Sequence, residues 1–187
     1  DHLDMEKLNA DYGYTLDGGT LGSIEDESFS ADAVSITIHG ISAHPGYAKN
    51  KMVNAIKVAS ELVAALPKDH LSPESTSHRE GFVHPTSITG HLETATVNFI
   101  IRDHVTANLK KHEDTLKNIL EQTLSNYPEL EHEFVVTEQY RNMKEILNEV
   151  PFVTDYAVQA MSKIGIESQP TIIRGGTDGS RLSFMGL

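Results

Sequence analysis

The apolar residues in the middle of the chain follow two different periods, and their order limits the folds open to it. Val34, Ile36 and Ile38 alternate with polar residues, which is the period of two typical of a half-buried strand. From Met52 to Leu66 the apolar spacing is helical, and Pro67 ends the run. This stretch therefore begins with a strand followed by a helix.

The same alternation continues downstream. Two strand candidates, Phe82–Leu92 and Thr94–Asp103, are close enough to form a hairpin around Glu93. A second amphipathic helix is marked by Leu109, Leu116, Ile119 and Leu120. A further strand is expected at Glu133–Thr137. The order βαββαβ predicts an α/β (α+β) fold of the split βαβ, or ferredoxin-like, kind.

The flanks of this βαββαβ unit behave differently, and the N-terminal one, up to about residue 27, is too small to bury a core. The N-terminal flank shows one short strand-like run, Tyr12–Leu16. The C-terminal flank is expected to hold a helix that starts near Pro151 and ends at Gly165, followed by a strand at Pro170–Ile173. We interpret the flanks as two arms of one second domain.

Composition excludes several classes of function. The chain has 15 basic and 27 acidic residues, a formal charge of −12, which argues against nucleic acid or an anionic membrane surface as the main partner. It has no cysteine, so any metal has to be held by histidine and carboxylate. No run of about 18 apolar residues and no leader pattern occur, and we expect a cytoplasmic protein.

Two glycine-bracketed segments, Tyr14–Gly19 and Ile173–Ser180, stand near the ends of the chain. Each places a charged side chain next to glycine, which lets backbone approach a ligand closely. In the first segment Asp17 can present its carboxylate to a cation, because the glycines after it keep the turn open. Asp-Gly is also a common turn dipeptide, so Asp17 can equally cap a plain turn.

His44 follows a strand and precedes Pro45 and Gly46, which make a rigid turn. A histidine held in this way can donate a hydrogen bond to a developing oxyanion, a role that depends on position more than on basicity. The alternative is a turn histidine bonded to backbone. Other histidines in polar surroundings, such as His112, are expected to be solvated.

Two arginines are candidates for binding an anion. Arg102 ends an apolar strand, where it can clamp a carboxylate in bidentate fashion or pair with an acid such as Asp103. Arg174 has the better claim, because glycines and hydrogen-bond donors follow it in a composition that suits a peptide's terminal carboxylate. A structural turn is the alternative. A nucleotide phosphate loop is not supported, because no Gly-Lys-Ser/Thr ending is present.

Four motifs occur in one order along the chain: YTLDGG at Tyr14–Gly19, HPGYAKNKMVNA at His44–Ala55, IIRD at Ile100–Asp103, and RGGTDGSRLSFMGL at Arg174–Leu187. In order and approximate spacing they resemble the peptidase T family of di-zinc tripeptide aminopeptidases, within a group that includes carboxypeptidase G and aminoacylase relatives. The resemblance covers essentially the whole chain. It implies zinc-dependent removal of the N-terminal residue from tripeptides.

The resemblance also implies roles for individual residues. Asp17 corresponds to a zinc ligand, and His44 to the lid-domain histidine that contacts the substrate or its oxyanion. The remaining candidates correspond to substrate-binding positions: Arg102, Arg174, Gly175, Thr177 and Asn98. Such a lid domain also implies a homodimer formed through it.

The family carries its other metal ligands and its general base outside the matched segments. The chain also begins without methionine and ends on an apolar stretch. We therefore expect a fragment that is inactive alone, with a βαββαβ lid/dimerisation domain at 28–140 between partial strips of the catalytic domain at 1–27 and 141–187. The acidic run Glu25–Glu27 is interpreted as a solvated turn.

Two other functions stay open at this level. One is a non-catalytic βαββαβ dimerisation module, and the other is a related di-zinc dipeptidase or aminoacylase. Metal binding separates the first from a peptidase. The sequence does not discriminate among short peptide substrates.

Overall fold

The computed structural model describes residues 3–187, which form two compact units. Unit 1 contains the described residues up to Ser30, together with His104–Thr106 and Tyr140–Leu187. Unit 2 contains Ala31–Asp103 and Ala107–Gln139. Unit 2 therefore interrupts the chain of unit 1 twice.

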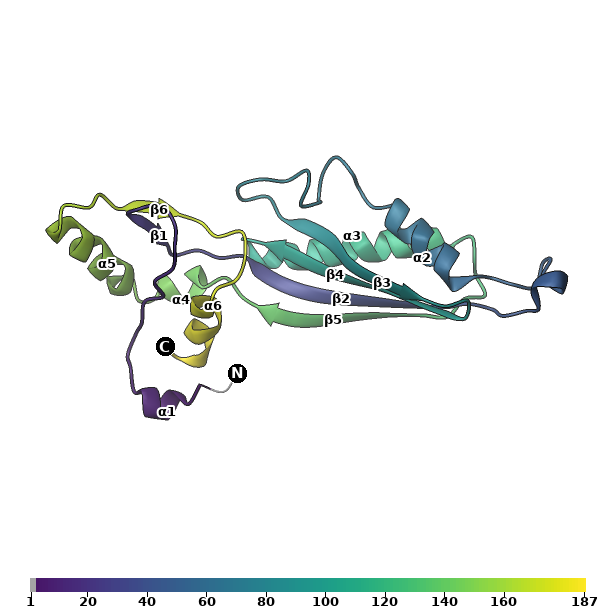
Figure 1. Cartoon of the computed structure of the whole chain (residues 1–187), viewed down its shortest axis with the longest axis horizontal. Helices are drawn as coiled ribbons and strands as arrows, with labels where there is room; N and C mark the ends of the chain where they lie inside the picture. Colours follow the sequence, from purple (N-terminus) through teal and green to yellow (C-terminus); the bar gives the residue numbers. More distant parts are fainter. Residues whose placement is uncertain (1–2) are drawn as a thin grey trace. The chain divides into compact units, whose positions relative to one another are not determined.

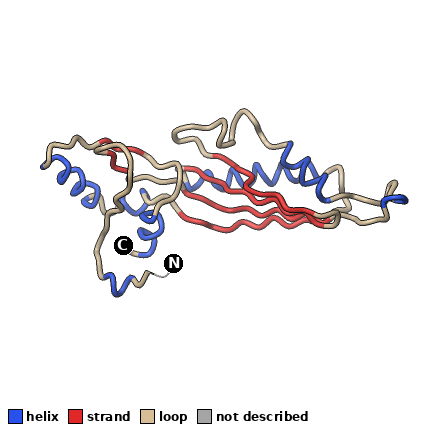
Figure 2. Tube along the Cα trace, viewed as in Figure 1, coloured by secondary structure: helices blue, strands red, loops and turns tan. Residues whose placement is uncertain are grey.

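Unit 2 is built on a four-stranded sheet with the order β3-β4-β2-β5. Its elements are β2 (Ser30–His39), α2 (Ala55–Ala64), β3 (Phe82–Gly90), β4 (Thr94–Asp103), α3 (Thr106–Leu124) and β5 (His132–Tyr140). Figures 1 and 2 show the long strands side by side with α2 and α3 running along them. The predicted βαββαβ order is confirmed, and the strand order is that of the ferredoxin-like arrangement.

Alternating side chains of the strands and one stripe of each helix form the core of unit 2. Asn54 begins α2, since its side chain accepts a hydrogen bond from the Ile56 amide, and Pro67 follows the end of the helix. The buried residues that meet in the core include Val34, Ile36, Ile38, Val58, Leu62, Val97, Phe99, Ile101, Leu109, Leu116 and Leu120. Burial of these apolar faces stabilises the unit.

The opposite face of β4 is only half-buried. It presents Thr96, Asn98, Ile100 and Arg102, because successive side chains of a strand point to opposite faces. The neighbouring strand β3 pairs with β4 in antiparallel register, with an irregularity between Pro85 and Ser87. β3 lies at the edge of the sheet, which is where a strand tolerates proline.

Unit 1 contains a two-stranded parallel pair and several short helices. Strand β1 (Ser23–Glu25) pairs with β6 (Gln169–Thr171). The helices are α1 (Met5–Leu8), α4 (Lys144–Leu147), α5 (Phe152–Lys163), α6 (Asp178–Leu182) and the 3-10 turn η2 (Ser183–Met185). The predicted helix after Pro151 is confirmed, and Gly165 follows it with a φ of 78° that favours glycine.

The predicted strand at Tyr12–Leu16 is wrong. This segment has no sheet partner among the described residues, and its aromatic rings pack on α5 instead. The Tyr14 hydroxyl donates a hydrogen bond to the carbonyl of Val153 (2.6 Å), and the Tyr12 ring lies 5.8 Å from that of Phe152. The alternation of Tyr12 and Tyr14 looked like that of a strand, but it reflects the packing of two rings on α5.

Buried hydrogen bonds join distant segments of unit 1. The Ser28 amide donates to Asn142 Oδ1 (3.1 Å), and the Asn142 amide donates to Ser30 Oγ (2.9 Å). Asn142 Nδ2 donates to the His104 carbonyl (2.9 Å), and Ser180 Oγ donates to Ser28 Oγ (2.9 Å). Satisfied networks of this kind specify one arrangement, because an unpaired buried polar group is costly.

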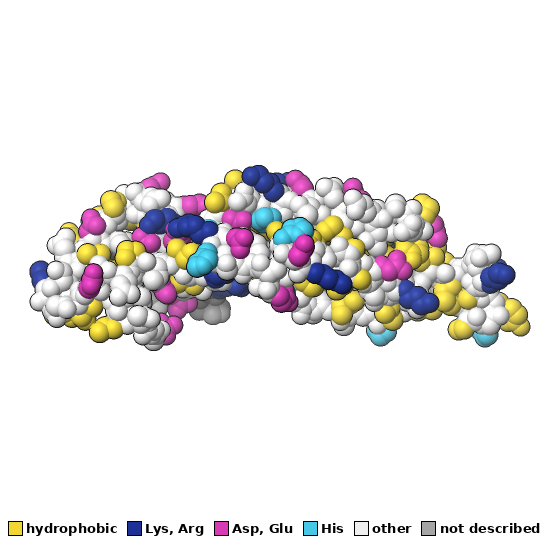
Figure 3. Space-filling view, turned by 90° about the horizontal axis from the view of Figure 1, so that it is seen from above, with side chains coloured by type: hydrophobic (Ala, Val, Ile, Leu, Met, Phe, Trp, Pro, Cys, Tyr) yellow, Lys and Arg dark blue, Asp and Glu magenta, His cyan; other side chains and the backbone are white. Residues whose placement is uncertain are grey.

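On the face shown in Figure 3, acidic, basic and histidine side chains are interspersed rather than gathered by sign. Among the described residues, we find no helix with the length and apolar character needed to cross a membrane.

Candidate functional site

His44 lies on a closed loop of unit 2. Ile41 and Val53 exchange backbone hydrogen bonds of 2.8 and 2.9 Å at the base of this loop. His44 caps the 3-10 turn η1 (Pro45–Tyr47) at the tip, and its Nδ1 accepts a hydrogen bond from the Gly46 amide at 3.2 Å. The side chain is exposed. The rigid turn expected at this position is therefore present.

Asn98 and Arg102 lie on the same, half-buried face of β4. Asn98 Nδ2 donates a hydrogen bond to Ser87 Oγ of the neighbouring strand (3.0 Å), and its carbonyl accepts one from Thr86 Oγ1 (3.1 Å). Arg102 pairs in register with Phe82 near the end of β4. The structure thus brings these two candidates onto one surface.

His44 and Arg102 lie at opposite ends of the sheet. Gly40 donates a backbone hydrogen bond to the Glu93 carbonyl (2.8 Å), so the end of β2 that leads to His44 lies beside the start of β4. Arg102 is eight residues further along β4, about 27 Å at roughly 3.4 Å per residue. The η1 turn projects beyond the near end of the sheet (Figure 1).

In unit 1, the loop that carries Arg174 runs beside the segment Glu27–Phe29. Ile173 donates a backbone hydrogen bond to the Glu27 carbonyl (2.9 Å), and Phe29 donates one to the Gly175 carbonyl (3.1 Å). The guanidinium carbon of Arg174 lies 5.1 Å from the centre of the buried Phe29 ring, within cation-π range. The arginine is therefore held over an aromatic ring.

The next residues of this loop have structural contacts. A Cβ at Gly176 would lie 2.7 Å from the Tyr140 ring, so a larger residue here would have to displace that ring. Thr177 begins α6 with a capping box, in which its side chain accepts from the Ser180 amide and Ser180 Oγ accepts from the Thr177 amide. Part of the glycine-rich motif therefore serves packing and helix capping.

Asp17 lies on an exposed segment of unit 1, where its Oδ1 accepts a hydrogen bond from the Gly18 amide (2.7 Å). Within residues 3–187, no group of three or more histidine, cysteine or acidic side chains is arranged to hold a metal ion. A catalytic zinc ion needs about three protein ligands. The described residues do not by themselves form a metal site, although Asp17 can supply one carboxylate.

Two buried histidine–carboxylate contacts and one buried pair of acids had no counterpart among the sequence predictions. His112 is not solvated as predicted: its Nε2 lies 2.8 Å from Asp103 Oδ2, and both side chains are largely buried. Glu27 is not part of a solvated turn either, since it is only 8% exposed and its Oε1 lies 3.8 Å from His104 Nδ1. The strand pattern held a weak signal for such pairs, because Asp103 occupies an inward position of β4.

The third pair is formed by Asp32 of β2 and Glu113 of α3, both buried. Burial raises the pKa of Glu113, and the hydrogen bond and charge of Asp32 raise it further. Lys110, 3.5 Å from Glu113, acts in the opposite direction. This pair joins β2 to α3 within unit 2.

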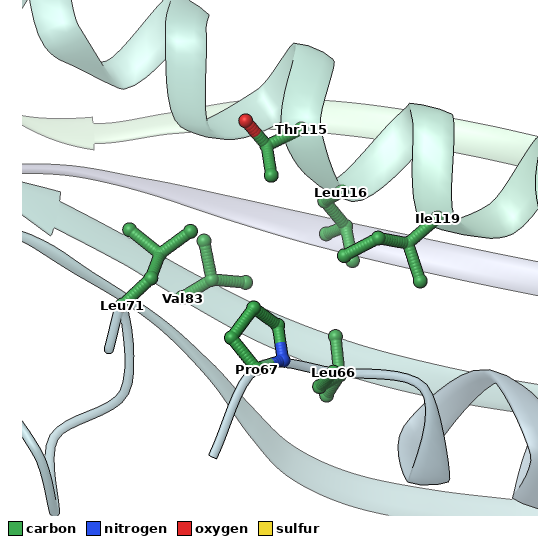
Figure 4. A pocket seen from close by; sticks show the side chains of 7 residues that line it. All are labelled: Leu66, Pro67, Leu71, Val83, Thr115, Leu116 and Ile119. Atoms are coloured by element: carbon green, nitrogen blue, oxygen red, sulfur yellow. The ribbon is translucent and has the colours of Figure 1, made fainter. Parts of the chain in front are cut away.

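A small apolar cavity lies where the loop after α2 meets α3 (Figure 4). It is lined by Leu66, Pro67, Leu71, Val83, Thr115, Leu116 and Ile119. Its free volume is about 10 Å³, which is at most one water molecule. It is too small to bind a peptide.

Comparison with known proteins gives a family match over the middle of the chain. The model of the peptidase dimerisation domain matches residues 27–128, which is just over half of the chain. This range includes β2, α2, β3, β4 and α3, and with them His44, Asn98 and Arg102.

Individual relatives extend the similarity to both units. A peptidase T from Clostridium novyi (strain NT) is 43% identical over 187 residues, which is all of this chain and 46% of the relative. The chain therefore spans about half the length of the curated relatives it matches. An aminopeptidase structure from Bacillus cereus ATCC 10987 matches 99% of this chain and 49% of its own, with a TM-score of 0.76 at 24% identity. A dinuclear metal-binding peptidase of the M20 family from Bacillus subtilis matches 88% of this chain and 42% of its own, with a TM-score of 0.57 at 14% identity.

Proposed function

Because this chain belongs to the peptidase dimerisation domain family, we propose that the intact protein is a zinc-dependent tripeptide aminopeptidase. It removes the N-terminal residue of tripeptides. The observation that carries the proposal is that similarity to a peptidase T runs through both units, at 43% identity over 187 residues. A dimerisation module without chemistry would not require similarity in unit 1.

In this proposal His44 donates a hydrogen bond to the oxygen of the scissile carbonyl as negative charge develops there. Arg174 grips the C-terminal carboxylate of the substrate, and its position over Phe29 supports this role by limiting its movement. Gly175 and Thr177 hold the Arg174 loop in place. Asn98 and Arg102 contribute a second polar surface for the peptide.

The distance between His44 and Arg102 limits how both can contact one substrate. A tripeptide spans about 11 Å when extended, whereas these residues are separated by about 27 Å of strand and a further loop. If both contact one tripeptide, they come from two copies of the chain. A homodimer formed through unit 2 supplies both, and the family's description as a dimerisation domain supports this arrangement.

Asp17 is proposed as a carboxylate ligand of one of two zinc ions, supported by the dinuclear metal binding named for the Bacillus subtilis relative. When bound, such ions supply an activated water for peptide hydrolysis. The other ligands are proposed to lie in parts of the intact protein outside this chain, which covers 46% of its relative's length.

The test compares a tripeptide with its C-terminal amide, using the full-length protein and its Arg174→Ala variant. Removing one partner of a buried charge pair costs about 2 to 5 kcal/mol, so amidation should lower kcat/KM of the wild type by at least about 30-fold. The Arg174→Ala variant should be nearly indifferent to amidation. If the variant still discriminates as the wild type does, Arg174 is not the carboxylate contact, and Arg102→Ala is then the informative variant.

Controls separate this function from its alternatives. Chelation should abolish turnover, and zinc should restore it. The 187-residue chain alone should show no turnover with zinc, because its described residues hold no complete ligand set. Faster hydrolysis of acylated amino acids or dipeptides than of tripeptides would favour the aminoacylase or dipeptidase alternative. If the full-length protein has no hydrolase activity at all, the non-catalytic dimerisation module is the remaining interpretation.

A further inference from the structure

The turn Ala43–Tyr47 uses histidine where a helix cap usually has a side-chain oxygen. His44 is extended, with φ −60° and ψ 126°, as expected for a residue that precedes proline. Its Nδ1 accepts a hydrogen bond from the amide of Gly46 at 3.2 Å, in the way that an aspartate or asparagine oxygen caps a helix. The imidazole is therefore part of the turn's backbone hydrogen bonding.

This contact decides which ring nitrogen carries the proton. A backbone N–H can only donate, so Nδ1 of His44 has to be the acceptor and carries no proton. In the neutral imidazole the single proton is then on Nε2. The contrast is His70, whose Nδ1 lies 2.7 Å from Asp69 Oδ1 and has to donate, because a carboxylate only accepts. The same residue type is thus set in two tautomers by its local partners.

Two neighbours also limit the orientation of the His44 ring. The ring of Tyr47 lies 5.4 Å from it, centre to centre, at an interplanar angle of 40°. A Cβ at Gly46 would lie 3.3 Å from Nδ1, which is tighter than most Cβ contacts, and 3.4 Å from Cε1. Gly46 thus leaves room for the hydrogen-bonded edge of the ring, and the exposed ring of Tyr47 lies tilted beside it.

We infer that Gly46 and Tyr47 are positioning residues that hold His44 as a neutral Nε2–H donor. The Gly46 amide sets the tautomer, and the Tyr47 ring sets the direction of the Nε2–H bond. The use of this donor toward a substrate oxygen rests on the function proposed above, whereas the tautomer does not. An imidazole held in this way can donate a hydrogen bond to an oxyanion while it is neutral.

The tautomer is measured by nuclear magnetic resonance on the 15N-labelled 187-residue chain. At about pH 8.5, two units above the ordinary histidine pKa of about 6.5, long-range proton-nitrogen correlations report which ring nitrogen is protonated. The His44→Gln variant assigns the signals. Exposed His132, for which the described part of the chain shows no side-chain hydrogen bond, is the reference. We expect a larger Nε2–H share for His44 than for His132, and an equal or smaller share overturns the inference.

The role of Tyr47 is tested by kinetics of the full-length protein. Tyr47→Ala should lower kcat about 10-fold with KM little changed, because a displaced donor weakens transition-state contacts. Tyr47→Phe keeps the ring and should restore kcat. In a His44→Ala background, Tyr47→Ala should cause no further loss. An equal loss in that background would show that Tyr47 does not act through His44.

A wild type without peptidase activity would refute the proposed function, while the tautomer measurement would still decide the part played by Gly46.

Discussion

Glu113 is a buried residue whose protonation depends on the fold. Burial, and then Asp32, raise its pKa above the ordinary value of 4.5. Between 4.5 and the raised pKa the native state binds more protons than the unfolded chain, so the free energy of unfolding falls as pH rises. Glu113→Gln should therefore be more stable than the wild type at neutral pH, and the difference should vanish below about pH 4. Urea unfolding at several pH values measures it.

Asp114→Asn is the matched control on the same helix. Asp114 is exposed and pairs with Lys110 at 2.8 Å, so its substitution should change the free energy of unfolding by about 0.5 kcal/mol or less. If Glu113→Gln is less stable than the wild type at neutral pH, the native state favours the carboxylate, and the expected direction of the pH dependence is wrong.

At the scale of elements, α3 holds unit 2 together through one stripe of side chains. Leu116 is fully buried on this helix and lines the small cavity of Figure 4. Leu116→Ala should lower the free energy of unfolding by about 2 to 5 kcal/mol, because it removes buried methyl groups and enlarges a cavity that already exists. Lys117→Ala, one position along on the exposed side, should change it by less than about 0.5 kcal/mol. Equal effects of the two substitutions would contradict this packing.

At the scale of the whole molecule, the distance between His44 and Arg102 predicts complementation between subunits. Full-length His44→Ala and Arg102→Ala variants should each be impaired. After they are mixed under conditions that exchange subunits, half of the dimers are mixed and each mixed dimer keeps one intact site, so activity should recover to about a quarter of the wild type. The rate of tripeptide hydrolysis before and after exchange measures this. No recovery between variants shown to exchange would mean that one chain supplies both residues.

The local pattern of the sequence was sufficient for most of the fold. The alternation in β2 and β4 and the helical spacing of α2 and α3 depend on residues two to four positions apart, so they can be read without tertiary contacts. Pro151 and Gly165 marked the ends of α5 for the same reason. The turn around His44 was also local, since Pro45 and Gly46 follow it directly.

The tertiary structure decided which distant residues meet. The Asp103–His112 and Asp32–Glu113 pairs form because α3 packs on the sheet. The inward position of Asp103 on β4 hinted that it is buried, but the sequence did not identify the partner of either acid. Tyr12 and Tyr14 pack against α5, although their own segment is predicted as a strand from the sequence. His44 and Arg102 lie in motifs that resemble the same peptidase family. Because β2 and β4 run antiparallel, the two residues are nevertheless separated by the length of the sheet. Sequence spacing carries no measure of such distances, because they depend on how strands pair and not on the residues between them.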